Sequence, residues 1–182
     1  MGFKIDLVAV RGLPPQDVHT QLHLFTNGAT ETEPESDVVA AELPTAWYLL
    51  YFNDRSPPDE EKLLALSANA EVLFLSVSET VMTSCAKYWQ NGESHWTIDH
   101  DCDVDAEHLH TTGTLPDCFN SIAQRLNSLQ RENDDADYIF DIPVDVFSHI
   151  TGFRYDGDFD GYINSFTVLN RLQLNRKWWK LW

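Results

Sequence analysis

The densest group of residues capable of metal chemistry lies at residues 99–110, which read DHDCDVDAEHLH. His100, His108 and His110 offer imidazole nitrogens, and the acids and Cys102 between them offer further ligands of the types that bind zinc. His108 and His110 are two residues apart, so on a strand they share a face. The spacing matches no established zinc motif, and a solvated acidic turn has the same composition. We therefore predict either a Zn²⁺ site at these histidines or an exposed acidic loop.

A second candidate site has the pattern of the first half of a calcium-binding loop. Asp156, Asp158 and Asp160 alternate along the chain, and Gly161 follows where such a loop turns sharply. The twelfth position, which requires a bidentate glutamate, is Thr167. An Asp/Gly turn without metal explains the same residues. The segment is thus either a Ca²⁺ site weaker than those of signalling proteins or an ordinary turn.

A third candidate is nucleophilic catalysis by Cys85, which follows Ser84 and precedes His95 and His100 across a predicted hairpin. A thiol needs an adjacent base to become a nucleophile, and a hairpin can place a cysteine opposite a histidine. The chain contains no phosphate-binding, dinucleotide-binding, serine-hydrolase or zinc-protease motif. Cysteine is also among the residues most often buried. We therefore expect an inert core thiol and assign no catalytic residue.

The chain is strongly acidic, with 29 acidic residues, 12 basic residues and a formal net charge of −17. Such a charge opposes binding to nucleic acid and to anionic lipid, and it favours either simple solubility or association with a more basic protein. Asp134, Asp135 and Asp137 form a cluster of acids that we predict to contact such a partner. An acidic face that mimics nucleic acid is a narrower version of the same hypothesis.

Residues 170–182, NRLQLNRKWWKLW, are basic, in contrast to the rest of the chain. The segment has four cations, no acid, and three tryptophans at Trp178, Trp179 and Trp182. Large aromatic side chains and cations are enriched at protein interfaces and at membrane surfaces. The segment is predicted either to dock on the acidic body of its own chain or to bind a partner.

Size and cysteine content are typical of a single intracellular domain. A chain of 182 residues with 43% apolar residues suits one globular domain, 1–182. Three cysteines give an odd count without a CxxC pair, so no disulfide framework is expected. The chain shows no signal peptide and no apolar run of the roughly 20 residues that span a membrane. A soluble, cytoplasmic protein is the expectation.

Apolar periodicity predicts strands at 3–10, 47–52 and 72–77, and helices at about 13–24, 60–69, 117–131 and 143–152. Asn91-Gly92 predicts a hairpin between residues 80–90 and 93–100. Further short strands are predicted at 108–112 and 138–141, and an exposed loop at 27–37. This order predicts one α+β domain with a mixed or mainly antiparallel sheet and helices packed on one face.

Three segments resemble those of a family of small, uncharacterised, acidic bacterial proteins: GFKIDLVAVRGLPP (2–15), CAKYWQNGESHWTIDHD (85–101) and DADYIFDIPVDVFSHITGFRYD (135–156). The resemblance covers most of the chain and implies no activity and no site residues. Charge, size and the motif search together favour a non-enzymatic binding or inhibitory protein of the immunity or antitoxin type, acting on a more basic protein. The alternative is a small metal-dependent enzyme or metal-binding protein that uses residues 95–110 or 156–161.

Overall fold

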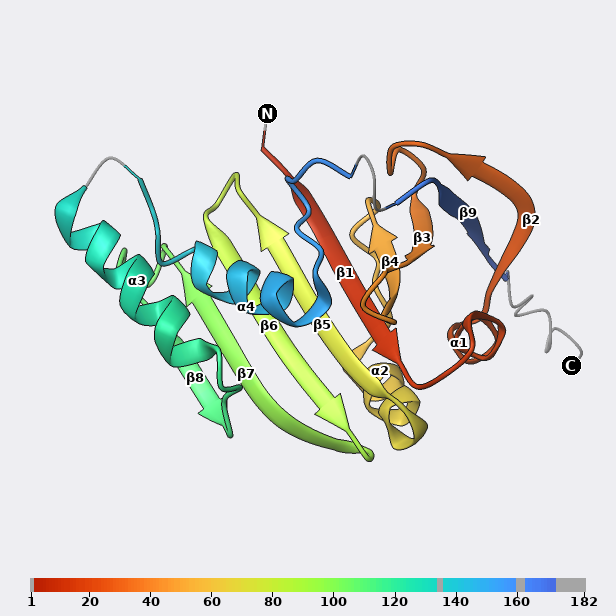
Figure 1. Cartoon of the computed structure of the whole chain (residues 1–182), viewed down its shortest axis with the longest axis horizontal. Coiled ribbons are helices and arrows are strands. Elements are labelled where there is room, and N and C mark those ends of the chain that lie inside the picture. Colours follow the sequence, from red (N-terminus) through yellow and green to blue (C-terminus); the bar gives the residue numbers. More distant parts are fainter. Residues whose placement is uncertain (1, 134–135, 160–162, 173–182) are drawn as a thin grey trace, which may run out of the picture.

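The chain folds around one nine-stranded sheet in which neighbouring strands are antiparallel (Figure 1). The structure is a computed structural model and describes residues 2–133, 136–159 and 163–172. Its strands are β1 (Lys4–Arg11), β2 (Leu24–Glu31), β3 (Val38–Glu42), β4 (Tyr48–Phe52), β5 (Glu71–Ser78), β6 (Thr83–Gln90), β7 (Glu93–Asp101), β8 (His110–Gly113) and β9 (Phe166–Arg171). Their order across the sheet is β2-β9-β3-β4-β1-β5-β6-β7-β8. β1 therefore lies at the centre, and β2 and β8 form the edges.

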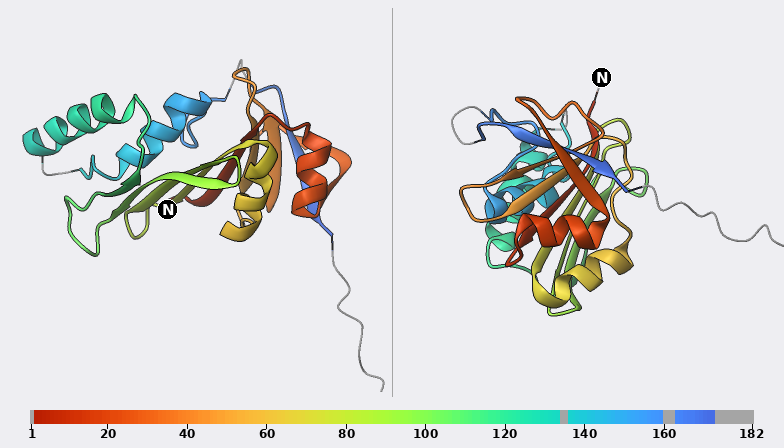
Figure 2. Two further views of the ribbon diagram at one scale, coloured as in Figure 1. Left: turned by 90° about the horizontal axis from the view of Figure 1, so that it is seen from below. Right: turned by 90° about the vertical axis from the view of Figure 1, so that its right-hand side faces the viewer.

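Helices lie on both faces of the sheet, rather than on one face as predicted. The helices are α1 (Pro15–Leu22), α2 (Glu60–Leu66) with a following 3₁₀ turn (Ser67–Asn69), α3 (Phe119–Glu132) and α4 (Asp141–Thr151). In the left-hand view of Figure 2, α3 and α4 lie above the sheet, whereas α1 and α2 lie below it, toward the other end of the molecule. The predicted α+β class with a mainly antiparallel sheet is confirmed.

The two-sided cover follows from the sequence of the central strand. In β1, Leu7 and Ala9 belong to the core under α3 and α4, whereas Val8 and Val10 belong to the core shared with α1 and α2. Alternate residues of a strand point to opposite faces, so a continuous apolar run needs cover on both. The continuous apolar run from Leu7 to Val10 therefore indicates helices on both faces of the sheet, and the prediction of helices on one face did not take it into account.

Several element boundaries follow local signals. Asn91 and Gly92 both have positive φ, 56° and 71°, which suits a tight hairpin turn, and they join β6 to β7 as predicted. The side chain of Asp59 caps α2 by accepting a hydrogen bond from the Lys62 amide at 2.9 Å. Gly152 ends α4 in the left-handed conformation, with φ 76°.

Three strands, β2, β3 and β9, form at positions for which the sequence pattern predicted no strand. β2 occupies part of the loop expected at residues 27–37 and is mostly exposed, and its pairing with β9 holds it at the sheet edge. β3 and β9 pair with each other and complete this end of the sheet. Residues 138–141, expected as a strand, instead lead into α4. An exposed edge strand lacks the apolar alternation that marks a half-buried one, so its signal is weak.

Candidate functional site

A row of polar residues crosses the part of the sheet that α1 and α2 leave uncovered. The strand registers place Asp6 opposite Ser76, Ser76 opposite Cys85, Cys85 opposite Asp99, and Asp99 opposite His110. Directly opposed residues of antiparallel strands lie on the same face, with Cβ atoms about 5 Å apart. β5–β8 therefore present one continuous polar row, which ends at the buried Asp6 of β1.

This row and its neighbours form what we call the open face, which consists of Ser76, Cys85, Lys87, Thr97, Asp99, His110 and Thr112. Exposure alternates along β7: Thr97 and Asp99 are partly exposed, whereas Ile98 and His100 point to the other face and are 0% exposed. α2 meets the border of the open face, where Glu60 pairs with Lys87 at 2.9 Å. α3 and α4 cover one side of β6 and β7 (Figure 2). On the other side, Trp89 is buried together with α2, whereas Cys85, Lys87, Thr97 and Asp99 stay partly exposed.

An acidic loop, residues 101–109, extends the open face beyond the end of β7. The carboxylate of Asp101 accepts a hydrogen bond from the Asp103 amide at 3.0 Å, and that of Asp105 accepts one from the Glu107 amide at 2.8 Å. These local bonds are Asx turns, which hold the backbone without a metal. Asp103, Asp105 and Glu107 are exposed, so the loop presents negative charge to the solvent.

Cys85 lies within the open face but is not arranged as a nucleophile. Burial, followed by the charge of Asp99, raises the pKa of the Cys85 thiol to about 12. Cys85 pairs with Asp99, whereas its neighbour Ser84 pairs with His100, so Cys85 and His100 lie on opposite faces of the sheet. His95 packs instead against the ring of Tyr88, with 5.6 Å between ring centroids. The structure therefore does not bring together the thiol and the base that the catalytic hypothesis needs.

A buried polar cluster on the other face joins two residues that the sequence analysis had assigned to different sites. His100 is fully buried, and its ring nitrogens contact the His108 carbonyl oxygen at 2.7 Å and the Asp137 carboxylate at 2.9 Å. Both ring nitrogens are therefore occupied by oxygen atoms of the protein itself. The second oxygen of Asp137 accepts from the Phe140 amide at 3.0 Å. Ser84 donates to the Phe140 carbonyl at 2.7 Å, so these residues do not form a catalytic triad.

This cluster links parts of the fold that are distant in the chain. It connects β6 and β7 to the acidic loop and to the turn before α4. The predicted contact of Asp137 with a partner stays a prediction, but both carboxylate oxygens already bind groups within the protein. No periodic or motif signal marks the pair, because its members are 37 residues apart.

The three histidines of the predicted zinc site do not converge. His100 is occupied as described, the Nδ1 atom of His108 accepts a hydrogen bond from the Asp101 amide at 3.0 Å, and His110 lies on the open face. Within residues 2–133, 136–159 and 163–172, no group of three or more His, Cys, Asp or Glu side chains is placed to hold a metal. Side-chain to backbone hydrogen bonds account for the positions of His100 and His108 instead.

Asp156, the first aspartate of the predicted calcium site, forms an ion pair with an arginine. The guanidinium of Arg154 binds Asp156 at 2.7 Å and Asp141 at 2.7 Å, and it also contacts Asp145. Asp156 thus shares one guanidinium of its own chain with two other carboxylates. Asp158 is exposed. Several predicted residues lie outside the described part of the chain: Asp134, Asp135, Asp160, Trp178, Trp179 and Trp182.

Comparison of the chain with protein-family models, curated proteins and solved structures finds no match. The resemblance noted in the sequence therefore stays a prediction. In the part of the chain that the structure describes, none of the helices has the length and apolar character needed to cross a membrane.

Proposed function

We propose that this chain is a non-enzymatic binding protein whose open face and acidic loop dock against a more basic protein. The observation that supports the proposal best is the open face itself, a polar surface on sheet strands whose opposite side is fully packed. A sheet gains stability from burial of one face, and a second face left accessible and rigid is suited to binding.

The charges of this surface favour a basic partner. Asp99, Asp101 and the exposed acids of the acidic loop lie on it or beside it, and its lysine, Lys87, is paired with Glu60. Complementary charge accelerates encounter and selects against acidic partners. An inhibitory role of the immunity or antitoxin type suits a small acidic domain, because binding alone is enough to neutralise a basic protein.

Exposed apolar side chains near the acidic loop supply the other requirement of a protein interface. Val104, at the tip of this loop, is 67% exposed, and Val81, in the turn between β5 and β6, is 46% exposed. The Cys102 amide donates to the Met82 carbonyl at 3.2 Å, so loop and turn lie side by side. Protein interfaces combine apolar contact with a polar, charged rim. This arrangement suits a folded protein partner better than a simple cation.

Site-specific photo-crosslinking in cells tests the proposal. A photoreactive residue at Thr97, on the open face, is expected to crosslink one polypeptide of net positive charge. The same residue at Gln124, an exposed position of α3 on the other side of the sheet, is the control and is expected not to crosslink it. Equal crosslinking from both positions, none from Thr97, or an acidic crosslinked protein would contradict the proposal.

A matched pair of charge variants measures the part played by the acidic loop. Asp103→Asn with Asp105→Asn is expected to weaken binding of the crosslinked protein by about tenfold or more, an effect that salt reduces. Glu33→Gln with Glu35→Gln changes the net charge equally in an exposed segment far from the open face and is expected to change affinity by less than about threefold. Equal losses in both variants would mean that overall charge, not this surface, determines binding.

A further inference from the structure

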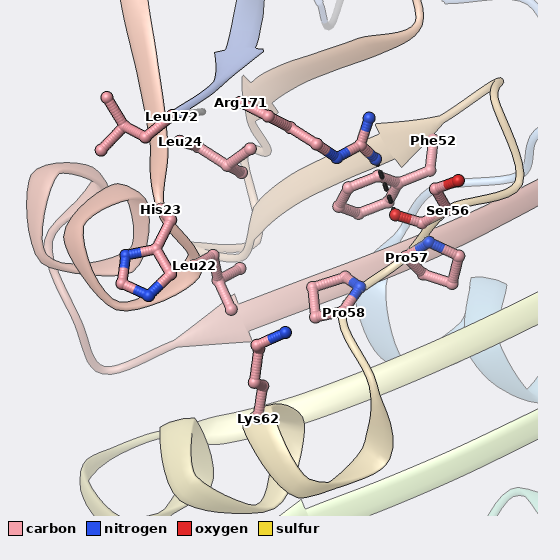
Figure 3. A pocket seen from close by; sticks show the side chains of 10 residues that line it. All are labelled: Leu22, His23, Leu24, Phe52, Ser56, Pro57, Pro58, Lys62, Arg171 and Leu172. Atoms are coloured by element: carbon pink, nitrogen blue, oxygen red, sulfur yellow. Dashed lines mark hydrogen bonds between the residues drawn. The ribbon is translucent and has the colours of Figure 1, made fainter. Parts of the chain in front are cut away.

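A pocket lies at the other end of the molecule, where α1, α2, β4 and β9 meet (Figure 3). Its volume is about 210 Å³. Apolar side chains form most of its wall, among them Leu22, Leu24, Phe52, Pro57, Pro58 and Leu172. Leu22, Leu24 and Phe52 are buried core residues, so this part of the wall is rigid.

Among the described residues, the charged side chains that line the pocket are two cations, Lys62 and Arg171, and none is a carboxylate. This is unusual in a chain with a net charge of −17. Two other hollows of the described surface each include an acid, Asp37 in one and Glu42 in the other. Each cation also pairs with a carboxylate outside the lining, Lys62 with Asp59 and Arg171 with Asp54, so an anionic ligand must compete with these pairs or add to them.

Arg171 is a fixed cation. Its guanidinium contacts the Asp54 carboxylate and donates to the Ser56 carbonyl at 2.6 Å, and its Cζ atom lies 5.8 Å from the centre of the Phe52 ring. A guanidinium has five N–H donors. Among the described residues, these contacts account for three of the donors, and they hold the guanidinium in place beside the pocket.

Lys62 is a movable cation. It pairs with Asp59 at 2.8 Å, and both side chains are largely exposed, at 49% and 60%. Exposed pairs of this kind contribute little to stability, so the ammonium can exchange Asp59 for another anion. Figure 3 shows the lysine side chain extending from α2 toward Pro58 and Leu22, at the mouth of the pocket.

We propose that this pocket binds a small monocarboxylate with an apolar body, placing the carboxylate between Lys62 and Arg171 and the apolar part against Leu24, Phe52 and Leu172. The volume equals that of about seven water molecules, which limits the ligand to roughly a dozen non-hydrogen atoms. Charge selects the carboxylate, and burial of the apolar part supplies the affinity. The pocket is separate from the open face, so the test of carboxylate binding is independent of the test of the proposed protein binding.

The test uses 4-phenylbutyrate, with 4-phenylbutylamine as the matched cation, titrated into the full chain and followed by two-dimensional NMR of backbone amides. Saturable shifts are expected at pocket residues such as Leu24 and Leu172, with a dissociation constant on the order of 1 mM for a ligand of this size. The amine is expected to bind at least about tenfold more weakly. Equal binding of acid and amine, or shifts confined to other surfaces, would overturn the proposal.

Two variants test the assigned contacts. Lys62→Met keeps the apolar stem and is expected to weaken binding of the carboxylate three- to tenfold, roughly. Lys4→Met removes another exposed lysine, far from the pocket, and is expected to leave the affinity unchanged. An unchanged affinity in Lys62→Met would overturn the proposal. Binding that appears only after deletion of residues 173–182 would also overturn it, because the chain itself would then be the occupant.

Discussion

Removal of the His100 ring tests whether the buried polar cluster holds the acidic loop and α4 to the sheet. His100→Ala deletes a hydrogen bond to the His108 carbonyl, worth about 1 kcal/mol, and one to the Asp137 carboxylate, worth about 2 kcal/mol. The ring is fully buried, so a cavity adds a further loss of about 1 kcal/mol. Asp137 is 15% exposed, and water can relieve part of its unpaired charge. We therefore expect a loss of about 3 kcal/mol, a large part of the usual stability of a domain.

The measurement is a double-mutant cycle by urea denaturation, with His100→Ala, Asp137→Ala and the double variant. If the two side chains interact directly, the double variant loses about 2 kcal/mol less than the sum of the single losses. Asp137→Asn is the milder variant in case His100→Ala does not fold. It keeps an acceptor for the Phe140 amide, and we expect a loss of about 1 kcal/mol.

Asp99→Ala is the matched control, since Asp99 precedes His100 on β7 but points to the open face. We expect its free energy of unfolding to change by less than about 0.5 kcal/mol. Two results would refute the reasoning. One is additivity of the cycle within about 0.5 kcal/mol, and the other is a loss in His100→Ala no larger than that in Asp99→Ala.

Three further predictions concern other parts of the fold. A thiol reagent at neutral pH should label the exposed Cys102 at least about 100-fold faster than Cys85, whose pKa burial raises to about 12; equal rates in the native protein would contradict this. Gly113→Ala should lower the free energy of unfolding by about 3 kcal/mol or more, because φ is +78° and the new Cβ would lie 1.9 Å from a backbone carbonyl oxygen. Gly28→Ala, with φ +87° and no atom within 4 Å, should lose only about 1 kcal/mol, and similar losses in the two would refute the steric argument. Burial raises the pKa of Asp6 above its ordinary value of 3.8. The preference of the folded state for protonated Asp6 therefore contributes fully to stability below about pH 3.8, and this contribution is lost as the pH rises through the pKa of the folded state. Denaturation at about pH 3.5 and pH 7 should therefore show Asp6→Asn gaining stability relative to the natural chain at the higher pH, and an opposite trend would contradict the assignment.

The parts of the fold that local sequence predicted are those whose cause is local. The hairpin at Asn91-Gly92 needs two residues of positive φ, and this pair adopts that backbone readily. α3 was recognisable from Ile122, Ala123 and Leu126, which recur on one helical face and are buried. β2 and β9 were missed because their positions depend on pairing with strands distant in the sequence, and their side chains show little apolar alternation.

The candidate site was predictable in composition but not in arrangement. The sequence grouped His100, His108 and His110 by proximity along the chain, and the strand geometry separated them, because adjacent residues of a strand point to opposite faces. The same alternation separated Cys85 from His100. The open face was not identified, although Thr97 and Asp99 alternate with the buried Trp96 and Ile98 along β7, the pattern of a strand with one exposed face.

By itself, the sequence determined the α+β class, the hairpin, the principal helices and the acidity of the surface, because these depend on composition and on contacts between near neighbours. Only the tertiary structure decided that His100 pairs with Asp137, that Lys62 and Arg171 line one pocket, and that part of one sheet face stays accessible. Each of these joins segments far apart in the chain. Which distant segments meet is determined by the burial of apolar faces over the whole domain, and no local pattern records that choice.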